Sequence, residues 1–285
     1  MAEIADEPVV PTRGDGLVRL RLELSYDGTD FAGWASQPGL RTVQDVLEQA
    51  LATALRVDRP RLVVAGRNDA GVHALGQVAH CELPAGSWAA GHGRIIRQLA
   101  GLLSGDVRVR SVTEVGDDFD ARFSALWRSY RYRICDRAAG VDPLRRRDTA
   151  SWRRTLDVTS MRQAARALLG LHDFVAFCRR REGASTIRQL QRLEVSRHAD
   201  IIEVAVRADA FCHSMVRSLV GALAAVGEGR QPVEWPADLL GLNRRSDQVT
   251  VAPARGLTLL EVGYPDAAGL AARAAEARAL RTAST

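Results

Sequence analysis

Two kinds of hydrophobic spacing alternate along this chain, and their order occurs twice. Apolar residues two apart indicate a strand from Val18 to Tyr26, and apolar residues three and four apart indicate a helix after a capping Thr42. Two strands that flank a glycine-rich loop, a helix through Ile95 and a strand near 106–114 complete the first series. The first series is therefore strand, helix, strand, strand, helix, strand, or βαββαβ.

The same order returns after residue 120. Strands are predicted at 128–135, 187–196, 201–208 and 257–263, with helices at 159–169 and through 215–223. Two ferredoxin- or RRM-like βαββαβ series predict an α+β fold with antiparallel or mixed sheets. We accordingly expect a flexible leader (1–16), an amino-terminal half (17–115), a linker (116–120), a carboxy-terminal half (121–265) and an Ala- and Arg-rich tail (266–285), which forms a loosely attached helix or is disordered.

Arginine supplies every basic residue of the chain. The 39 basic residues exceed the 34 acidic ones and give a net charge of +5, and lysine is absent. Arginine binds phosphate with two hydrogen bonds and stacks on bases, so this composition is compatible with nucleic-acid binding. The acidic start of the chain and the lack of an apolar run of roughly 18 residues argue against a secretory signal and a membrane span, which predicts a soluble cytoplasmic protein.

Cysteine and histidine spacing gives no sign of a metal site. The four cysteines form no CxxC pair, and the six histidines show no HxxxH or HxH spacing. We therefore expect no metal and no disulfide framework, and we interpret the cysteines as small buried residues.

The glycine-rich loop carries an acid that could act in catalysis. Three glycines surround Asp69 within residues 65–80, and Arg67 stands two residues before the acid. Glycine adopts backbone conformations that other residues resist, so such a loop can present a single side chain. A nearby arginine would orient the carboxylate as a nucleophile requires. Spacing alone also fits an ordinary Asx-type turn with a weak exposed ion pair.

Two further stretches combine aromatic and basic residues. Alternation within 128–133 places Tyr130 on one face of a strand and Arg131 on the other. A tyrosine there could stack on a base or handle a proton, or it could pack in the core. Within 211–217, Arg217 near the start of a helix could meet a carboxylate or a phosphate, or it could be a solvated surface charge.

Together these three stretches resemble the tRNA pseudouridine synthases of the TruA type, whose hallmark loop reads Gly-Arg-Thr-Asp-Ala-Gly-Val-His-Ala. The resemblance covers about residues 17 to 265, and besides the loop it includes Tyr26-Asp27-Gly28, Phe31, Gly33-Trp34, Val43-Gln44, Asp118-Phe119, Ala121 to Ala125, Tyr130 to Tyr132, His172 to Phe174, Met215 to Arg217, Gly256-Leu257 and Tyr264-Pro265. Two positions depart from the family. Asn68 stands where the family has threonine, and Leu99 to Gly105 lacks the family's Asn-x-x-Leu-Pro-x-Asp-type segment.

The resemblance implies a pseudouridine synthase fold, in which two similar α+β halves join their sheets around a central cleft, and it implies a homodimer. It implies an enzyme that turns uridine into pseudouridine in the anticodon stem-loop of tRNA, at positions 38 to 40, without a cofactor. Asp69 would be the nucleophile, and Tyr130 would lie against the flipped base and remove the C5 proton. Arg67 and Arg217 would hold Asp69 and the sugar-phosphate. The residues expected to bind the substrate are Arg122, Asn68, His73, Arg131 and His213.

Arginine clusters at 145–147, 153–154 and 179–181 are candidates for contact with the tRNA backbone. Two other classes of function stay open. One is a catalytically inactive RNA-binding relative, because Asn68 changes the signature loop. The other is an unrelated RRM-like binding module, which would need an RNP1-type Arg-Gly-Phe-Gly-Phe run that this sequence lacks.

Overall fold

The structure is a computed structural model, and it describes residues 16–179 and 185–278. The expected leader therefore lies outside the described residues except for Gly16, as do the last seven residues of the expected tail and Arg180 and Arg181. Within the described ranges, no helix is long and apolar enough to cross a bilayer.

The first part of the chain forms four strands and three α-helices. They are β1 (Leu17–Tyr26), α1 (Val43–Leu55), β2 (Val63–Val64), β3 (His73–Pro84), α2 (Ala85–Gly91), a 3-10 turn (His92–Arg94), α3 (Ile95–Leu102) and β4 (Val107–Val115). Side chains of β1 are alternately buried and partly exposed, as the spacing predicts. The predicted cap is also present, because the Thr42 side chain accepts a hydrogen bond from the Asp45 amide over 3.3 Å.

The second part contains the remaining strands and helices. They are β5 (Trp127–Cys135), β6 (Ala150–Ser151), α4 (Val158–Arg166), β7 (Gly170–Asp173), β8 (Ile187–His198), β9 (Ile201–Ala208), α5 (Met215–Gly227), α6 (Trp235–Asp238), β10 (Leu257–Gly263) and α7 (Leu270–Arg278), with 3-10 turns at Pro143–Arg145, Val175–Phe177, Leu239–Gly241, Ala254–Gly256 and Ala267–Gly269. Every strand and helix that we predicted for this part is present. The short α6, β6 and β7 were not predicted, because four residues or fewer carry no clear period.

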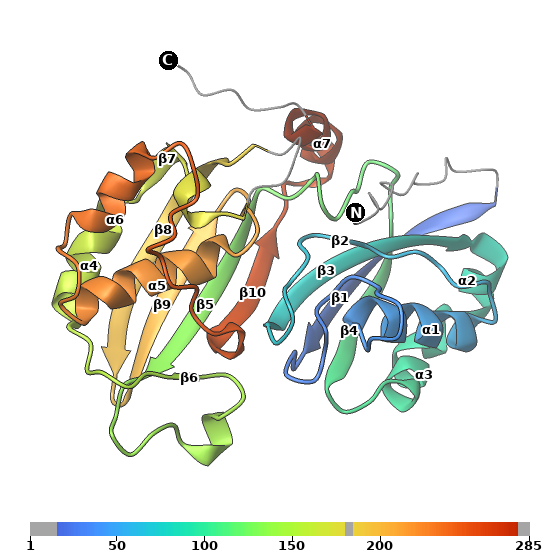
Figure 1. The fold of residues 1–285 in the computed structure, drawn as a ribbon. Helices are drawn as coiled ribbons and strands as arrows, with labels where there is room; N and C mark the ends of the chain where they lie inside the picture. Colours follow the sequence, from blue (N-terminus) through green and yellow to red (C-terminus); the bar gives the residue numbers. More distant parts are fainter. Residues whose placement is uncertain (1–15, 180–184, 279–285) are drawn as a thin grey trace.

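All strands of the described residues belong to one mixed, ten-stranded sheet. The order is β4-β1-β3-β10-β5-β9-β8-β7, with β2 on β3 and β6 on β5. The pairs β10–β3 and β5–β6 are parallel, and the other pairs are antiparallel. Within the sheet, the two parts are joined by the pairing of β3 with β10, in which Thr258 pairs with His73 and Leu259 with Ala74. In Figure 1, α4, α5 and α6 lie over the β5-β9-β8 region, and α1 to α3 lie beside the β4-β1-β3 region.

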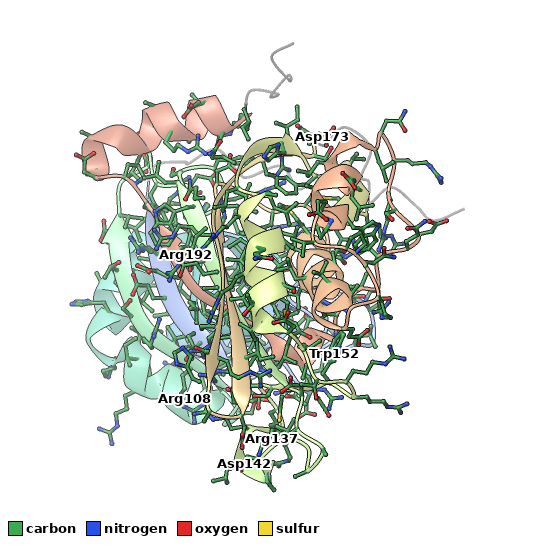
Figure 2. The ribbon with its side chains drawn as sticks, turned by 90° about the vertical axis from the view of Figure 1, so that its left-hand side faces the viewer. Arg108, Arg137, Asp142, Trp152, Asp173 and Arg192 are labelled. Atoms are coloured by element: carbon green, nitrogen blue, oxygen red, sulfur yellow. A yellow bond between two sulfur atoms is a disulfide. The ribbon has the colours of Figure 1, made fainter. Side chains whose placement is uncertain are left out.

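The carboxy-terminal helix α7 packs against the segment that links β4 to β5. Arg273 Nε donates to the Ala125 carbonyl over 3.2 Å, and Ser124 Oγ donates to the Leu270 carbonyl over 3.3 Å. The described part of the expected tail is therefore an attached helix. Figure 2 places α7 at the top of the view and Arg137 and Asp142, in the loop after β5, at the opposite end.

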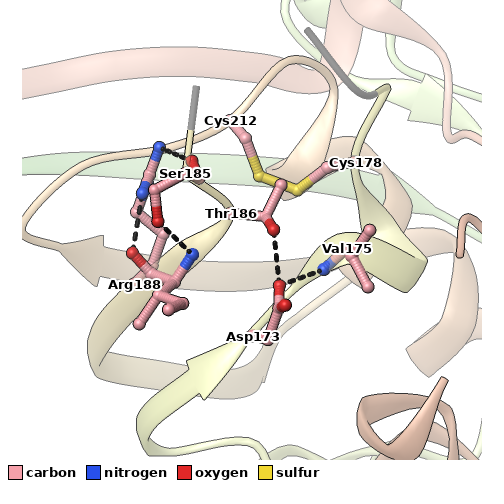
Figure 3. Close-up of a disulfide and its surroundings, with 8 residues drawn as sticks. Asp173, Val175, Cys178, Ser185, Thr186, Arg188 and Cys212 are labelled. Atoms are coloured by element: carbon pink, nitrogen blue, oxygen red, sulfur yellow. Dashed lines mark hydrogen bonds between the residues drawn. A yellow bond between two sulfur atoms is a disulfide. The ribbon is translucent and has the colours of Figure 1, made fainter. Parts of the chain in front are cut away.

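Two of the four cysteines depart from our prediction. Cys81 and Cys135 are free and buried as expected, but Cys178 and Cys212 form a disulfide with a Cα–Cα distance of 5.7 Å (Figure 3). The prediction of no disulfide is wrong for this pair. The two cysteines are 34 residues apart, and only the fold brings the segment after β7 beside the segment before α5.

Candidate active site

The loop that carries Asp69 connects β2 to β3 and rests on the segment after β1. The Trp34 amide donates to the Asn68 carbonyl over 3.1 Å, and the Val72 amide donates to the Asp69 carbonyl over 3.2 Å. Gly33 has a φ of +101°, and a Cβ there would lie 3.0 Å from the Asn68 carbonyl oxygen. Glycine therefore allows the two backbones to approach closely enough to hold the loop.

The Asp69 carboxylate is held by residues around the start of α5. Arg217 Nη1 donates to its Oδ2 over 3.0 Å, and His213 Nε2 lies 3.1 Å from its Oδ1. Ser214, the residue that precedes α5, donates from Oγ to Oδ2 over 3.5 Å. The carboxylate thus lies at the positive end of a helix dipole and beside a guanidinium, while its side chain remains 26% exposed.

Arg217 is fixed at a second point. Its Nε donates to the Ala252 carbonyl over 2.7 Å, and the Ala252 amide donates back to the Arg217 carbonyl over 3.1 Å. Only 20% of the Arg217 side chain is exposed. A guanidinium held at two sites can direct one N–H at Asp69 with little loss of side-chain entropy. This contact joins residues 148 positions apart, so it exists only in the folded chain.

Asn68 joins two buried tyrosines beneath the loop. Its Nδ2 donates to the Tyr26 hydroxyl over 2.7 Å, and its Oδ1 accepts from the Tyr130 hydroxyl over 3.2 Å. Burial raises the pKa of Tyr26 to about 12, and burial likewise raises the pKa of Tyr130. Both hydroxyls are therefore neutral near pH 7. The Tyr130 ring packs edge-on against Phe211, with ring centroids 5.1 Å apart.

Asp69, Tyr130, Arg217, Asn68 and His213 thus come together around one loop. Arg67 lies on the same loop with an exposed side chain. From the sequence, we assigned no role at the site to Tyr26, Phe211 and Ser214, although we named the motifs that contain them. The alternation of β1 indicated only that Tyr26 belongs to the buried face, and nothing in the spacing showed that its hydroxyl meets Asn68.

The other expected substrate-binding residues lie elsewhere. His73 is buried, where its Nδ1 accepts from the Gly28 amide over 3.0 Å and its Nε2 lies 3.1 Å from the Arg255 carbonyl. Arg131 projects from the face of β5 opposite Tyr130, and its Nε lies 3.4 Å from Glu203. Burial, with the neighbouring Arg133, lowers the pKa of Arg131.

Arg122 is exposed in the segment before β5. Its guanidinium lies over the Phe123 ring, 4.9 Å from the centroid. Its backbone amide donates to Asp120 Oδ1 over 2.8 Å. The segment is therefore bonded through its backbone, and the Arg122 side chain stays at the surface.

The described residues contain no group of three or more His, Cys, Asp or Glu side chains placed to hold a metal ion. The chemistry that the geometry offers is that of a partly exposed carboxylate, oriented by a guanidinium and an imidazole, next to a neutral phenol. Such a carboxylate can act as a nucleophile or as a base.

Comparison with known proteins gives the family. A family model described as tRNA pseudouridine synthase matches residues 164–265. The chain is 58% identical over 268 residues to tRNA pseudouridine synthase A of Frankia casuarinae, with 94% of this chain and 97% of that protein covered. Identity is 52% over 270 residues with the Streptomyces griseus protein of the same name, covering 94% of this chain and 95% of that protein, and 50% over 276 residues with the Mycobacterium leprae protein, covering 93% and 96%.

Among solved structures, the archaeal box H/ACA sRNP Nop10-Cbf5 complex matches 72% of this chain and 43% of that chain. The identity is 11% and the TM-score is 0.32, which is too low to support an argument about fold. The sequence relatives carry the assignment instead, because their identity of 50% or more extends over nearly the whole length of both proteins. The chain therefore belongs to the family of tRNA pseudouridine synthase A, a family of isomerases.

Proposed function

We propose that this protein isomerises uridine to pseudouridine in the anticodon stem-loop of tRNA, at positions 38 to 40, with Asp69 as the nucleophile and no cofactor. The names of the relatives support tRNA as the substrate. One observation supports Asp69 as the nucleophile. The Asp69 carboxylate is held on both oxygens, by Arg217 at 3.0 Å and His213 at 3.1 Å, and is still open to a ligand.

The proposed reaction keeps every atom of the nucleoside. Asp69 attacks, the bond between N1 and C1′ breaks, and the detached base turns. A bond then forms between C5 and C1′, and the bond to Asp69 breaks and restores the carboxylate. The C5 proton leaves, and N1 gains a proton. Attack on the sugar and attack on the base both begin at the same carboxylate. Flipping the nucleotide out of its stack costs a few kcal/mol, which is least in a loop or at its edge.

Tyr130 is the proposed acceptor of the C5 proton. It lies on β5 with its hydroxyl bonded to Asn68, the residue that precedes the nucleophile. Because burial raises the pKa of Tyr130, the phenol is neutral in the free protein, so its oxygen takes the C5 proton only as its own hydroxyl proton leaves to solvent, which also supplies the proton that N1 gains. The phenol must then pass a proton on, so we expect Tyr130→Phe to bind tRNA normally and to lose turnover. Normal turnover by this variant would remove the proposed proton role.

Several residues are proposed to hold the substrate. Arg67 and His213 lie beside Asp69 with exposed or half-exposed side chains, which suits contact with the sugar-phosphate. We assign Arg122 to the RNA backbone because its guanidinium is at the surface. His73 would support the loop through its bonds to Gly28 and Arg255. Arg131 lies on the face of β5 opposite Tyr130, beside Glu203, so it would meet RNA outside the cleft.

We further propose that the chain is built from two βαββαβ halves, 17–115 and 121–265, joined by the linker 116–120 and followed by the tail from 266. The strand order supports this division. The first four strands run β4-β1-β3-β2, and the corresponding strands of the second part run β10-β5-β9-β8. Each series thus has its last strand beside its first, then its third and its second. The active-site cleft would lie between the halves, with Asp69 from one and Tyr130 and Arg217 from the other.

The proposed partner is the negatively charged tRNA backbone, bound by a homodimer in the cytoplasm. Arginines of the clusters at 145–147 and 153–154 are exposed in the described structure. Phosphate contacts release counterions, so tRNA affinity should fall as salt rises. An affinity that stays flat between low and moderate salt would contradict this proposal. Sedimentation would test the dimer.

The central test follows hydrogen release from C5. Unmodified tRNA transcripts carrying tritium at uridine C5 are incubated with the wild type, Asp69→Ala and the isosteric Asp69→Asn, and the sites of pseudouridine are mapped chemically. We expect the wild type to release tritium and both variants to bind tRNA without releasing it. Undiminished release by the variants would refute Asp69 as the nucleophile. A wild type that binds tRNA without forming pseudouridine would instead identify a catalytically inactive RNA-binding relative.

A further inference from the structure

Arg128 is a buried cation whose hydrogen bonds go to carbonyl oxygens. Its side chain lies at the start of β5, and the residue is 8% exposed. Nη1 donates to the Asp209 carbonyl over 2.8 Å, and Nη2 donates to the carbonyls of Ala65 over 2.8 Å and Arg122 over 2.6 Å. Within 16–179 and 185–278, no carboxylate pairs with this guanidinium. Burying a charge without a counterion costs free energy of folding, which indicates that Arg128 has a function.

Each of the three carbonyls belongs to a segment that carries residues of the proposed site. Ala65 immediately precedes the loop of Asn68 and Asp69. Asp209 follows β9 and leads, within four residues, to Phe211 and His213. Arg122 belongs to the exposed segment before β5. These segments lie far apart in sequence, and among the described residues Arg128 is the side chain that is bonded to all three.

The position of Arg128 on β5 adds a fourth connection. Residues two apart on a strand project from the same face, so Arg128 and Tyr130 stand side by side beneath the loop. Strand β5 therefore fixes the positions of the Ala65 carbonyl, the Phe211 ring and the Tyr130 hydroxyl. A planar guanidinium can donate in several fixed directions at once, which neither lysine nor an apolar side chain can do.

We propose that Arg128 is a positioning residue of the reaction, which sets the spacing between the loop of Asp69 and the segment of Phe211 and His213. This proposal rests on the roles proposed above for Asp69 and Tyr130. In this proposal, Arg128 does not touch the substrate. Its effect passes through the carbonyls of Ala65 and Asp209, so its loss should slow the chemical step and leave tRNA affinity nearly unchanged.

The test compares Arg128→Lys and Arg128→Met with the wild type in three measurements. They are the single-turnover rate of tritium release at saturating tRNA, the dissociation constant for tRNA, and the urea midpoint of unfolding. A misplacement of about 1 Å costs up to about 100-fold in rate, so we expect a loss of about tenfold for Arg128→Lys and about 100-fold for Arg128→Met. The dissociation constant should change less than about threefold, because no RNA contact is removed.

Arg19 provides the matched control. Its side chain is 14% exposed, and it also bonds a backbone carbonyl, that of Phe119 over 3.1 Å, in addition to Glu82. It lies seven residues along β1 from Tyr26, far from the loop. Arg19→Lys and Arg19→Met should lower the urea midpoint while the rate per folded molecule stays within about twofold of the wild type.

Three results would overturn the proposal. They are a folded Arg128→Met that turns over at the wild-type rate, a rate loss accounted for by the unfolded fraction, and a rate loss matched by an equal loss of tRNA affinity. If Arg128→Met does not fold, Arg128→Lys decides by the same criteria. Asp69→Asn is measured in parallel. If it is inactive while the Arg128 variants are fully active, only the role of Arg128 fails, and if it is active, the proposed function fails.

Discussion

Replacing Asn68 by alanine removes the bridge between two buried tyrosines, and its effect can be worked out from the contacts. Asn68 is 8% exposed, Tyr130 is 6% exposed and Tyr26 is 5% exposed. Each of the two hydrogen bonds contributes about 1 kcal/mol to stability, and a buried hydroxyl left without a partner costs about 1 kcal/mol or more. Asn68→Ala should therefore lower the free energy of unfolding by about 2 to 4 kcal/mol.

Threonine, the family's usual residue at this position, should restore part of that loss. Its hydroxyl can donate once and accept, but it is too short to reach both tyrosines as the amide does over 2.7 and 3.2 Å. We expect Asn68→Thr to cost about 1 to 2 kcal/mol, half the effect of alanine. The loop should therefore keep its conformation with either residue.

Urea denaturation at pH 7 measures both losses, and a double-mutant cycle isolates the bond to Tyr130. Combining Asn68→Ala with Tyr130→Phe should give a coupling of about 1 kcal/mol. Asn243→Ala, at an exposed position, serves as the control and should change stability by less than about 0.5 kcal/mol. A loss below about 0.5 kcal/mol for Asn68→Ala, or a coupling near zero, would refute the reasoning.

Two further predictions concern stability. Burial lowers the pKa of His80 to about 4, and its Nδ1 accepts from the Ala121 amide over 3.0 Å. Since only the unfolded chain takes up this proton, the free energy of unfolding should fall by up to about 3 kcal/mol as the pH drops from about 6.5 to about 4, and His80→Gln should lack this component in parallel urea titrations. A Cβ on Gly221 would lie 1.7 Å from the Thr250 carbonyl oxygen, so Gly221→Ala should cost about 3 kcal/mol, whereas Gly101→Ala, with open space, should gain about 0.5 kcal/mol; equal thermal shifts would contradict this.

The local spacing of apolar residues was sufficient to predict most of the secondary structure. Period-two alternation located β1 and β5, and the Thr42 cap marked the start of α1. The same alternation put Tyr130 and Arg131 on opposite faces of one strand, which the contacts of both side chains bear out. These features depend on neighbours within a few residues, and the sequence displays such neighbours directly. Short elements such as β7 were not predicted, because they contain too few residues to show a period.

Long-range partners required the folded chain. The sequence marked Asp69 and Arg217 separately, but the 3.0 Å contact between them depends on how α5 packs against the β2–β3 loop. The bond between Cys178 and Cys212 was missed for the same reason. The sequence showed Asn68 as a departure from the family's threonine, and only the structure shows that its side chain joins Tyr26 to Tyr130. A hydrogen bond or a disulfide is set by distance in space, and residues far apart in sequence acquire that distance only when the sheet has formed.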